Sequence, residues 1–67
     1  MKLTINGEHH EFQPQELTVS DLLGELGLRG RPVAVEVNHR LVFKREHESA
    51  KLQDGDRVEV VTMVGGG

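Results

Sequence analysis

The chain contains no cysteine, no tryptophan and no tyrosine, and it has only two prolines in 67 residues. The absence of cysteine excludes disulfides, thiolate metal sites and any covalent chemistry on a thiol of the chain itself. Phe12 and Phe43 are the only aromatic residues, so the chain lacks the stacking surfaces with which proteins bind single-stranded nucleic acids. The formal net charge of −3 also argues against a nucleic-acid partner, since such binders are basic.

Long apolar runs are missing as well. The first six residues alternate between apolar and polar side chains, which fits neither a signal peptide nor a transmembrane helix. We therefore expect a cytoplasmic protein with no membrane partner. A chain of this length predicts one small domain with a compact, aliphatic core and no large internal active-site cavity.

Two alternating segments near the N-terminus predict an antiparallel hairpin. Leu3 and Ile5 alternate with polar neighbours, and residues 9–13 alternate again after Asn6 and Gly7. An Asn-Gly pair between alternating segments is the strongest short-range signal for a hairpin turn. The pattern predicts strands over residues 1–6 and 9–13.

A single helix is predicted after this hairpin. Thr18 is the expected N-cap, Asp21 lies at the third helical position, where a carboxylate favours the helix dipole, and Gly27 is the expected stop. The helical spacing i, i+3, i+4, i+7 predicts one apolar face, formed by Val19, Leu22, Leu23 and Leu26.

Three further strands complete the predicted order β-β-α-β-β-β, over residues 33–37, 41–43 and 58–64. This order is that of an α+β, ubiquitin-like β-grasp fold, a mixed sheet of four to five strands packed on one helix. The apolar last strand is expected in a central position beside the first. The predicted core consists of Leu3, Ile5, Phe12, Leu22, Leu26, Val35, Val58 and Val60.

The apolar residues at the end of the last strand allow two interpretations. Alternation holds through Val58 and Val60 and then fails, because Val61, Met63 and Val64 follow closely. The strand could be buried on both faces. Alternatively, Val61, Met63 and Val64 form an exposed apolar patch that binds a partner protein.

No pattern for an enzyme site stands out. His9 and His10 are adjacent, so in a strand they point to opposite faces and cannot readily bind one ion. The four histidines are therefore expected to be solvated surface residues. Neither Ser20 nor Ser49 lies in a nucleophile motif, and the Asp-Gly-Asp sequence at residues 54–56 is explained by turn chemistry. We predict no catalytic residue, no metal site and no bound cofactor.

The sequence finishes with Gly65, Gly66 and Gly67 directly after the last strand. We divide it into a domain over residues 1–64 and a flexible tail over residues 65–67. Glycine has no Cβ, so such a tail can enter a slot that any side chain would block, and the carboxylate of Gly67 would be unshielded. The alternative is a frayed end or a remnant of processing.

Five stretches occur together in one order: KLTING at residues 2–7, TVSDLL at 18–23, VAVEVN at 33–38, LQDGDRVEVV at 52–61 and VGGG at 64–67. In this combination the chain resembles the ThiS family, the sulfur carrier proteins of thiamine thiazole synthesis, along nearly its full length. The Asp-Gly-Asp turn, the apolar strand and the glycine terminus are the most specific part of this resemblance.

The resemblance implies a protein carrier and not an enzyme. A ThiF-like adenylyltransferase would use ATP and magnesium to adenylate the Gly67 carboxylate, with the tail inside its active site. A persulfide sulfur donor would then convert Gly67 into a thiocarboxylate, and a ThiG-like thiazole synthase would take the sulfur.

Other functions remain open from the sequence. A MoaD-like small subunit of molybdopterin synthase, a carrier for tRNA thiolation and a protein modifier would share the fold and the glycine terminus. A plain β-grasp binding module, such as the TGS type, would share the fold but would not use the glycine terminus.

Overall fold

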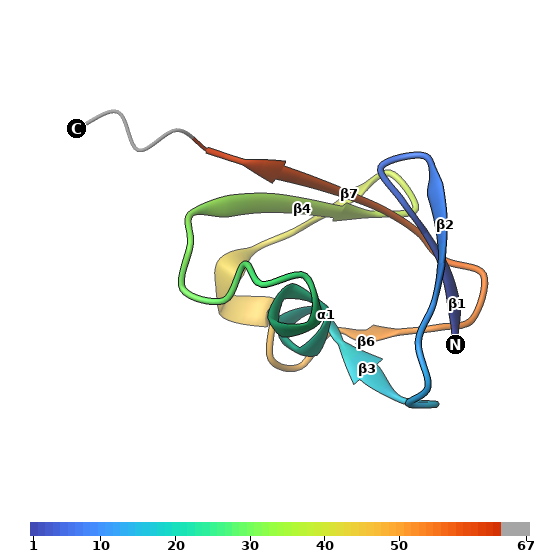
Figure 1. Ribbon diagram of the computed structural model, residues 1–67. Coiled ribbons are helices and arrows are strands. Elements are labelled where there is room, and N and C mark those ends of the chain that lie inside the picture. Colours follow the sequence, from blue (N-terminus) through green and yellow to red (C-terminus); the bar gives the residue numbers. More distant parts are fainter. Residues whose placement is uncertain (64–67) are drawn as a thin grey trace.

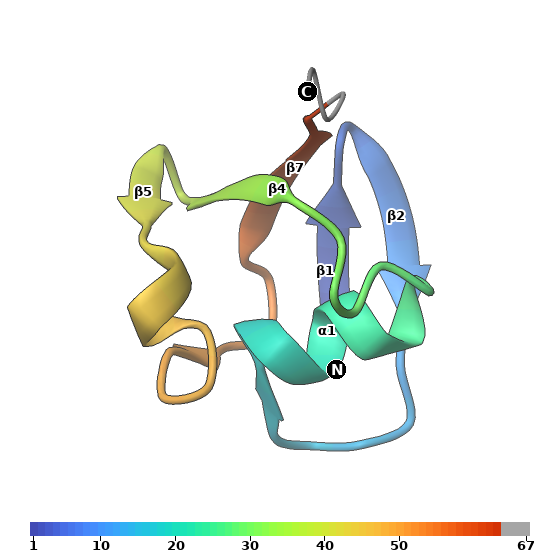
Figure 2. The same ribbon diagram turned by 90° about the vertical axis from the view of Figure 1, so that its left-hand side faces the viewer.

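A mixed sheet wrapped around one helix forms the framework of the chain, of which the computed structural model describes residues 1–63 (Figure 1). The five-stranded sheet has the order β2-β1-β7-β4-β5. Its strands are β1 (Lys2–Ile5), β2 (Glu8–Glu11), β4 (Val33–Val37), β5 (Arg40–Val42) and β7 (Arg57–Thr62). The helix α1 (Val19–Glu25) lies across one face of this sheet (Figure 2). The predicted β-grasp fold and its sheet of up to five strands are confirmed.

The last strand is central, as expected. β7 pairs in parallel with β1 and antiparallel with β4, and the two other strand pairs in this sheet are antiparallel. A parallel pair needs a long crossover connection, which the helix and the later strands provide. The domain boundary at residue 64 and the flexible tail over residues 65–67 lie outside the described residues.

Two tight turns join the antiparallel hairpins. Asn6 and Gly7, between β1 and β2, have φ angles of 50° and 84°, and Asn38 and His39, between β4 and β5, have 51° and 68°. Positive φ at both central residues gives a two-residue turn whose twist matches that of the flanking strands. The hairpin predicted from Asn6 and Gly7 is confirmed; β1 is one residue shorter than predicted at each end, and β2 starts one residue earlier and ends two residues earlier than predicted.

A capping box starts α1. The Asp21 amide donates to the Thr18 hydroxyl oxygen, and the Thr18 amide donates to the Asp21 carboxylate, both at 3.0 Å. The bond from the Thr18 backbone is the main reason why the pKa of Asp21 lies below its ordinary value of 3.8. Gly27, with φ of 73°, follows the C-cap. An added Cβ at Gly24 would meet only the guanidinium of Arg29, the end of a flexible side chain that can move aside, so nothing in the structure requires glycine there.

The core lies between α1 and the inner face of the sheet. Its buried apolar residues are Leu3, Ile5, Leu17, Val19, Leu22, Leu23, Val35, Leu52, Val58 and Val60. Two predicted core residues are only partly buried. Phe12 follows the edge strand β2, where its ring stacks on His10 with centroids 6.1 Å apart. Leu26 is the C-cap of α1, where the helix no longer faces the sheet.

The charged segment 44–51 is more ordered than its sequence predicts. It contains the 3₁₀ helix η1 (Lys44–Glu46) and part of β6 (Lys51–Leu52), which pairs with β3 (Leu17–Thr18) in a separate two-stranded sheet. The prediction that all histidines are solvated is wrong for His47, which is 7% exposed. Its ring Nε2 lies 3.1 Å from the Val42 carbonyl oxygen, because η1 turns the side chain inward.

Within residues 1–63, no helix is long and apolar enough to cross a membrane.

Candidate functional site

β7 is the element that leads to the glycine residues, and it extends past its neighbour β1. Only Arg57 and Val58 pair with β1, whereas β4 pairs with every residue from 58 to 62. The ladder to β4 is prolonged by the Met63 amide, which donates to the Pro32 carbonyl at 2.9 Å. The end of β7 therefore lies along β4 as an extended strand (Figure 1), and Gly65, Gly66 and Gly67 follow it in sequence outside the described residues.

Buried and exposed side chains alternate along β7 as far as Val61, one residue further than the apolar pattern of the sequence indicated. Val58 and Val60 are buried, while Glu59 and Val61 are exposed. The interpretation of a strand buried on both faces is therefore wrong. Val61 is 59% exposed and Met63 53%, so two members of the predicted apolar patch do face outward; the third, Val64, lies outside the described residues.

The tertiary structure adds two apolar residues to this surface. Leu41, in β5, and Phe43, directly after it, are 52% and 47% exposed. Leu41, Phe43 and Met63 line one groove of about 840 Å³ together with Pro32 and Ala34. Val61 lies opposite Ala34 in the strand register and is exposed beside this groove's strand β4, but it is not one of the residues that line the groove. We call the five residues Leu41, Phe43, Val61, Met63 and Pro32 the apolar patch.

The sequence pattern did not identify Leu41 and Phe43 as members of the exposed apolar surface. The signal was present, because Leu41 and Phe43 alternate with the inward-facing Val42. The alternation could not be interpreted without the pairing of Leu41 with Glu36, which shows that Leu41 lies on the outer face of the sheet.

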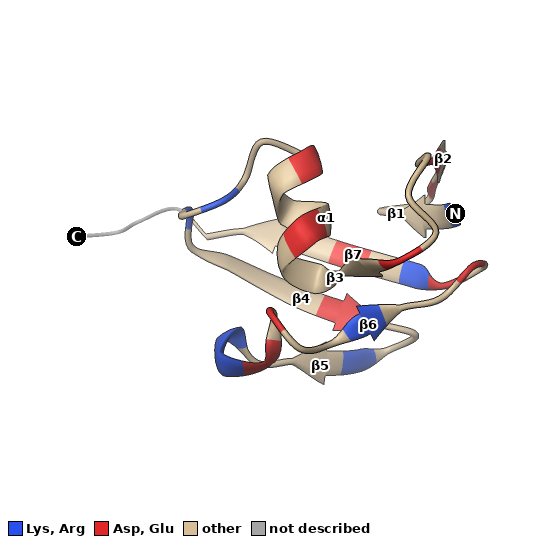
Figure 3. Ribbon diagram, turned by 90° about the horizontal axis from the view of Figure 1, so that it is seen from below, with Lys and Arg blue, Asp and Glu red and all other residues tan. Residues whose placement is uncertain are grey.

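The charged residues around the groove are mainly basic, although the chain as a whole is acidic. Arg29, Arg31 and Lys44 line the groove, with Glu48 as the one acidic residue among the groove's described lining. The guanidinium carbon of Arg45 lies 4.8 Å from the centre of the Phe43 ring, a cation–π arrangement. In Figure 3, these basic residues lie in two segments, η1 and the loop before β4, and both segments are on the side of the molecule toward the C-terminus. The surface is suited to a partner with apolar and acidic groups.

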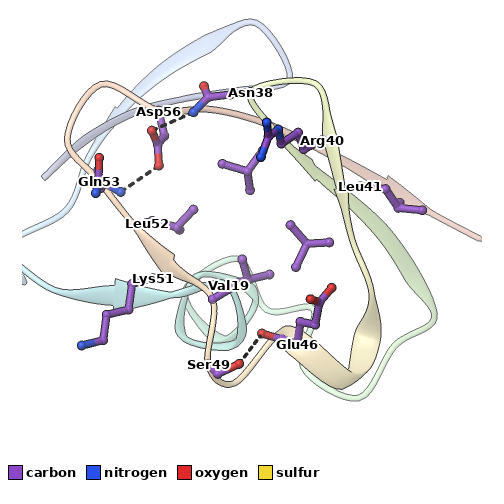
Figure 4. A pocket seen from close by; sticks show the side chains of 13 residues that line it. Val19, Asn38, Arg40, Leu41, Glu46, Ser49, Lys51, Leu52, Gln53 and Asp56 are labelled. Carbon is purple, nitrogen blue, oxygen red and sulfur yellow. Dashed lines mark hydrogen bonds between the residues drawn. The ribbon is translucent and has the colours of Figure 1, made fainter.

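A second pocket, of about 580 Å³, lies between β5 and β6 (Figure 4). Several of its polar groups are engaged in the loops around it. The Asp56 carboxylate accepts from the Asn38 side chain at 3.0 Å and from the Gln53 amide at 2.8 Å. The Ser49 hydroxyl donates to the Glu46 carbonyl at 3.3 Å. These bonds give Asp56, Asn38 and Ser49 a structural role, and among residues 1–63 no group of three or more metal-ligating side chains occurs.

Comparison with known proteins connects the β-grasp fold to a family. The family model described as the ThiS family matches residues 3–67. The chain belongs to the ThiS family. It is 34% identical over 65 residues to the sulfur carrier protein ThiS of Bacillus subtilis, covering 97% of this chain and 98% of that protein. A crystal structure of the thiamine biosynthesis protein ThiS from Geobacter metallireducens superposes with a TM-score of 0.86, at 32% identity and over 100% of both chains.

Two longer proteins also match the whole chain. The thiazole synthase of Paramagnetospirillum magneticum is 48% identical to it, and that of Magnetococcus marinus 39%, both over 67 residues. The chain spans only 20% of the length of each. The sulfur carrier protein ThiS of Bacillus subtilis is matched over nearly its full length, and the prediction that this chain is a protein carrier rather than an enzyme stays a prediction.

Proposed function

We propose that this chain carries sulfur as a thiocarboxylate on the terminal carboxyl group of Gly67 and donates it for the thiazole ring of thiamine. The observation that carries the proposal is the extent of the family match, which runs through residue 67 and so includes all three glycines. The relation to a named sulfur carrier over nearly the full length of both chains supports it further.

The first chemical step activates an unreactive group. A carboxylate is a poor electrophile, so an oxygen of the Gly67 carboxylate attacks the α-phosphorus of ATP and pyrophosphate leaves. The resulting acyl adenylate has AMP as a good leaving group. In this proposal, ATP and magnesium are bound by a ThiF-like adenylyltransferase and not by the carrier.

The second step introduces sulfur. The terminal sulfur of a persulfide donor attacks the Gly67 carbonyl carbon and displaces AMP. The carrier and the donor are then joined through an acyl disulfide. A thiol then reduces the sulfur–sulfur bond, and the thiocarboxylate is released while that thiol is oxidised to a disulfide. The chain has no cysteine, so this thiol must belong to a partner. The proposal places the carrier in the cytoplasm, where ATP and thiols are available.

The apolar patch beside the end of β7 provides the docking surface in this proposal. Val61 and Met63 are exposed immediately before the tail, so a partner that covers them would receive Gly65, Gly66 and Gly67 in its active site. Interfaces of this kind have an apolar centre and a polar rim, which here is basic. A ThiG-like thiazole synthase is the proposed acceptor, because two proteins named thiazole synthase contain a segment similar to the whole chain. The same similarity favours thiazole formation over molybdopterin synthesis, tRNA thiolation or a plain binding module.

The experiment is intact mass measurement after incubation with a ThiF-like enzyme, ATP, magnesium and a persulfide donor. We expect the parent chain to gain the mass difference between a sulfur and an oxygen atom. One extra residue after Gly67 adds roughly 3.3–3.6 Å, and misplacement of about 1 Å can reduce a rate about a hundredfold. The extended chain should therefore not be adenylated. Gly66→Val should also fail, because a β-branched side chain would fill the slot and stiffen the backbone.

Gln15→Ala is the matched control, since Gln15 is exposed in the loop before β3, and it should be activated like the parent. Melting curves of all variants show whether the fold is intact. If the extended chain is activated as fast as the parent, the carrier proposal fails and a binding module becomes the better account.

A further inference from the structure

The side chain of Asn6 is bonded to the backbone of β7 in the manner of a strand. Its Oδ1 accepts from the Val60 amide at 2.8 Å, and its Nδ2 donates to the Val60 carbonyl at 3.1 Å. The two residues are 54 positions apart in sequence. A primary amide presents the same donor and acceptor as a peptide group, so Asn6 acts as a strand partner one residue long.

The position of this contact follows from the direction of the backbone bonds along β7. Odd-numbered residues face β4: the Arg57 carbonyl accepts from Asn38 and the Met63 amide donates to Pro32. Even-numbered residues face β1, as the bond from the Asn6 amide to the Val58 carbonyl at 2.9 Å shows. β1 ends at Ile5, so its backbone cannot reach Val60. The Asn6 side chain extends the pairing on the β1 side by one residue, to Val60. Up to Val60, β7 therefore has a hydrogen-bonding partner along each of its two edges in the described structure.

We propose that Asn6 is a positioning residue for the reaction at the C-terminus. It keeps the end of β7 extended, so that a partner has to order only the residues beyond it. Without the Asn6 amide, residues 60–62 are held by β4 alone and fray, and the partner must order them on binding at an entropic cost. The inference rests on the proposed function, because it assigns Asn6 a role in presenting Gly67 to the adenylating enzyme.

Asn38 offers a matched control within the same chain. It also has a positive φ, 51° against 50° for Asn6, and it also makes two side-chain bonds. Its Oδ1 accepts from the Arg57 amide and its Nδ2 donates to Asp56, both at 3.0 Å. These bonds hold the start of β7, at the end remote from the tail. Glycine tolerates positive φ without strain, so Asn6→Gly and Asn38→Gly remove equivalent bonds while leaving the turns intact.

The first measurement is amide hydrogen exchange on the isolated chain. In Asn6→Gly we expect protection of the Val60 amide to fall about tenfold, as for the loss of one hydrogen bond. The Met63 amide, which bonds to Pro32 beyond the fraying residues, should also lose protection. In Asn38→Gly the Arg57 amide should lose protection and the Val60 amide should not. Equal loss throughout β7 in both variants would overturn the local role of Asn6.

The second measurement is adenylation by the ThiF-like enzyme, with the carrier as the varied substrate. Asn6→Gly should raise KM about tenfold or more, because ordering even one of residues 60–62 has an effect of this size, with kcat within about twofold of the parent. Asn38→Gly should leave both constants near those of the parent at a similar loss in melting temperature. If Asn6→Gly is too unstable to assay, Asn6→Asp replaces the donor by an oxygen that faces the Val60 carbonyl, and its KM should also rise above that of the parent.

The outcomes separate the two proposals. A parent chain that is not adenylated overturns the proposed function, and the positioning role with it. A parent that is adenylated, with equal KM values for Asn6→Gly and Asn38→Gly, overturns the positioning role alone. A selective rise in KM for Asn6→Gly supports both.

Discussion

Single side chains set the ends of the elements in this chain. Thr18 and Asp21 satisfy each other's backbone amides at the start of α1, and such a cap matters because the first amides of a helix have no partner within it. Asn6 and Asn38 adopt positive φ and bond to β7 or its entry. At the residue scale, polar side chains therefore determine where elements start and how their ends are held.

The cap makes stability dependent on pH. The folded pKa of Asp21 is depressed, chiefly by the bond from the Thr18 amide, so the ionised form stabilises the fold above the unfolded pKa. This stabilisation is lost as the pH falls below about 3.8 and through the folded pKa. Asp21→Asn should be less stable than the parent at neutral pH, and the difference should shrink in acid. Urea midpoints measured over this pH range test the prediction. Gln15→Ala, which removes no titratable group from an exposed loop, should show a difference that stays nearly constant.

The element that combines structure and function is β7. Its inner residues Val58 and Val60 are buried against the helix side, and its outer residue Val61 and the following Met63 are exposed. A strand has a period of two, so one element can hold the core together and present an apolar surface to a partner. The same strand carries the chain toward the glycines.

Met63→Asp should weaken binding to the adenylating partner about tenfold or more, because a charge would replace an apolar group in the centre of the patch. The fold should survive, since Met63 is 53% exposed. Titration calorimetry or a pull-down with the ThiF-like enzyme gives the affinity. Met63→Leu should bind like the parent. Gln15→Asp, which changes the charge by the same amount in an exposed loop, should have little effect. Unchanged affinity in Met63→Asp would move the interface elsewhere.

The molecule as a whole depends on one small core. A domain of about this size buries only about 60% of the surface of its unfolded chain, and α1 is the one α-helix in residues 1–63. Leu22, fully buried at 0% exposure, lies where this helix meets the sheet. Stability is therefore concentrated in few contacts, and the separate β3–β6 pair adds Leu17 and Leu52 to them.

Leu22→Ala should lower the free energy of unfolding by roughly 2–5 kcal/mol, the range for removing a buried leucine side chain and leaving a cavity. Small domains have few kcal/mol in total, so a large fraction of the variant should be unfolded at room temperature. Urea denaturation followed by circular dichroism measures this loss. Leu41→Ala makes the same chemical change at a residue that is 52% exposed, and its effect should stay within about 0.5 kcal/mol. Similar losses in both variants would contradict the assignment of the core.

Much of the architecture could be predicted because its signals are local. The Asn6-Gly7 turn, the Thr18 cap and the alternation of Leu3 with Ile5 each depend on neighbours in sequence, and all three are present. The local pattern failed where partners come from afar. His47 is buried because η1 and the Val42 carbonyl enclose it, and the two-residue strand β6 exists only because Leu17 and Thr18 lie beside it.

The β-grasp order of the main strands and the helix, the central last strand and the glycines after it could be predicted from the pattern of residues. The exposure of Val61 and Met63, the position of Leu41 and Phe43 and the contact of Asn6 with Val60 became evident from the folded chain alone. The reason is physical: the period of a strand specifies two faces but does not say which face another element covers. A residue such as Asn6 can replace a strand partner only when folding brings it beside a strand 54 positions away.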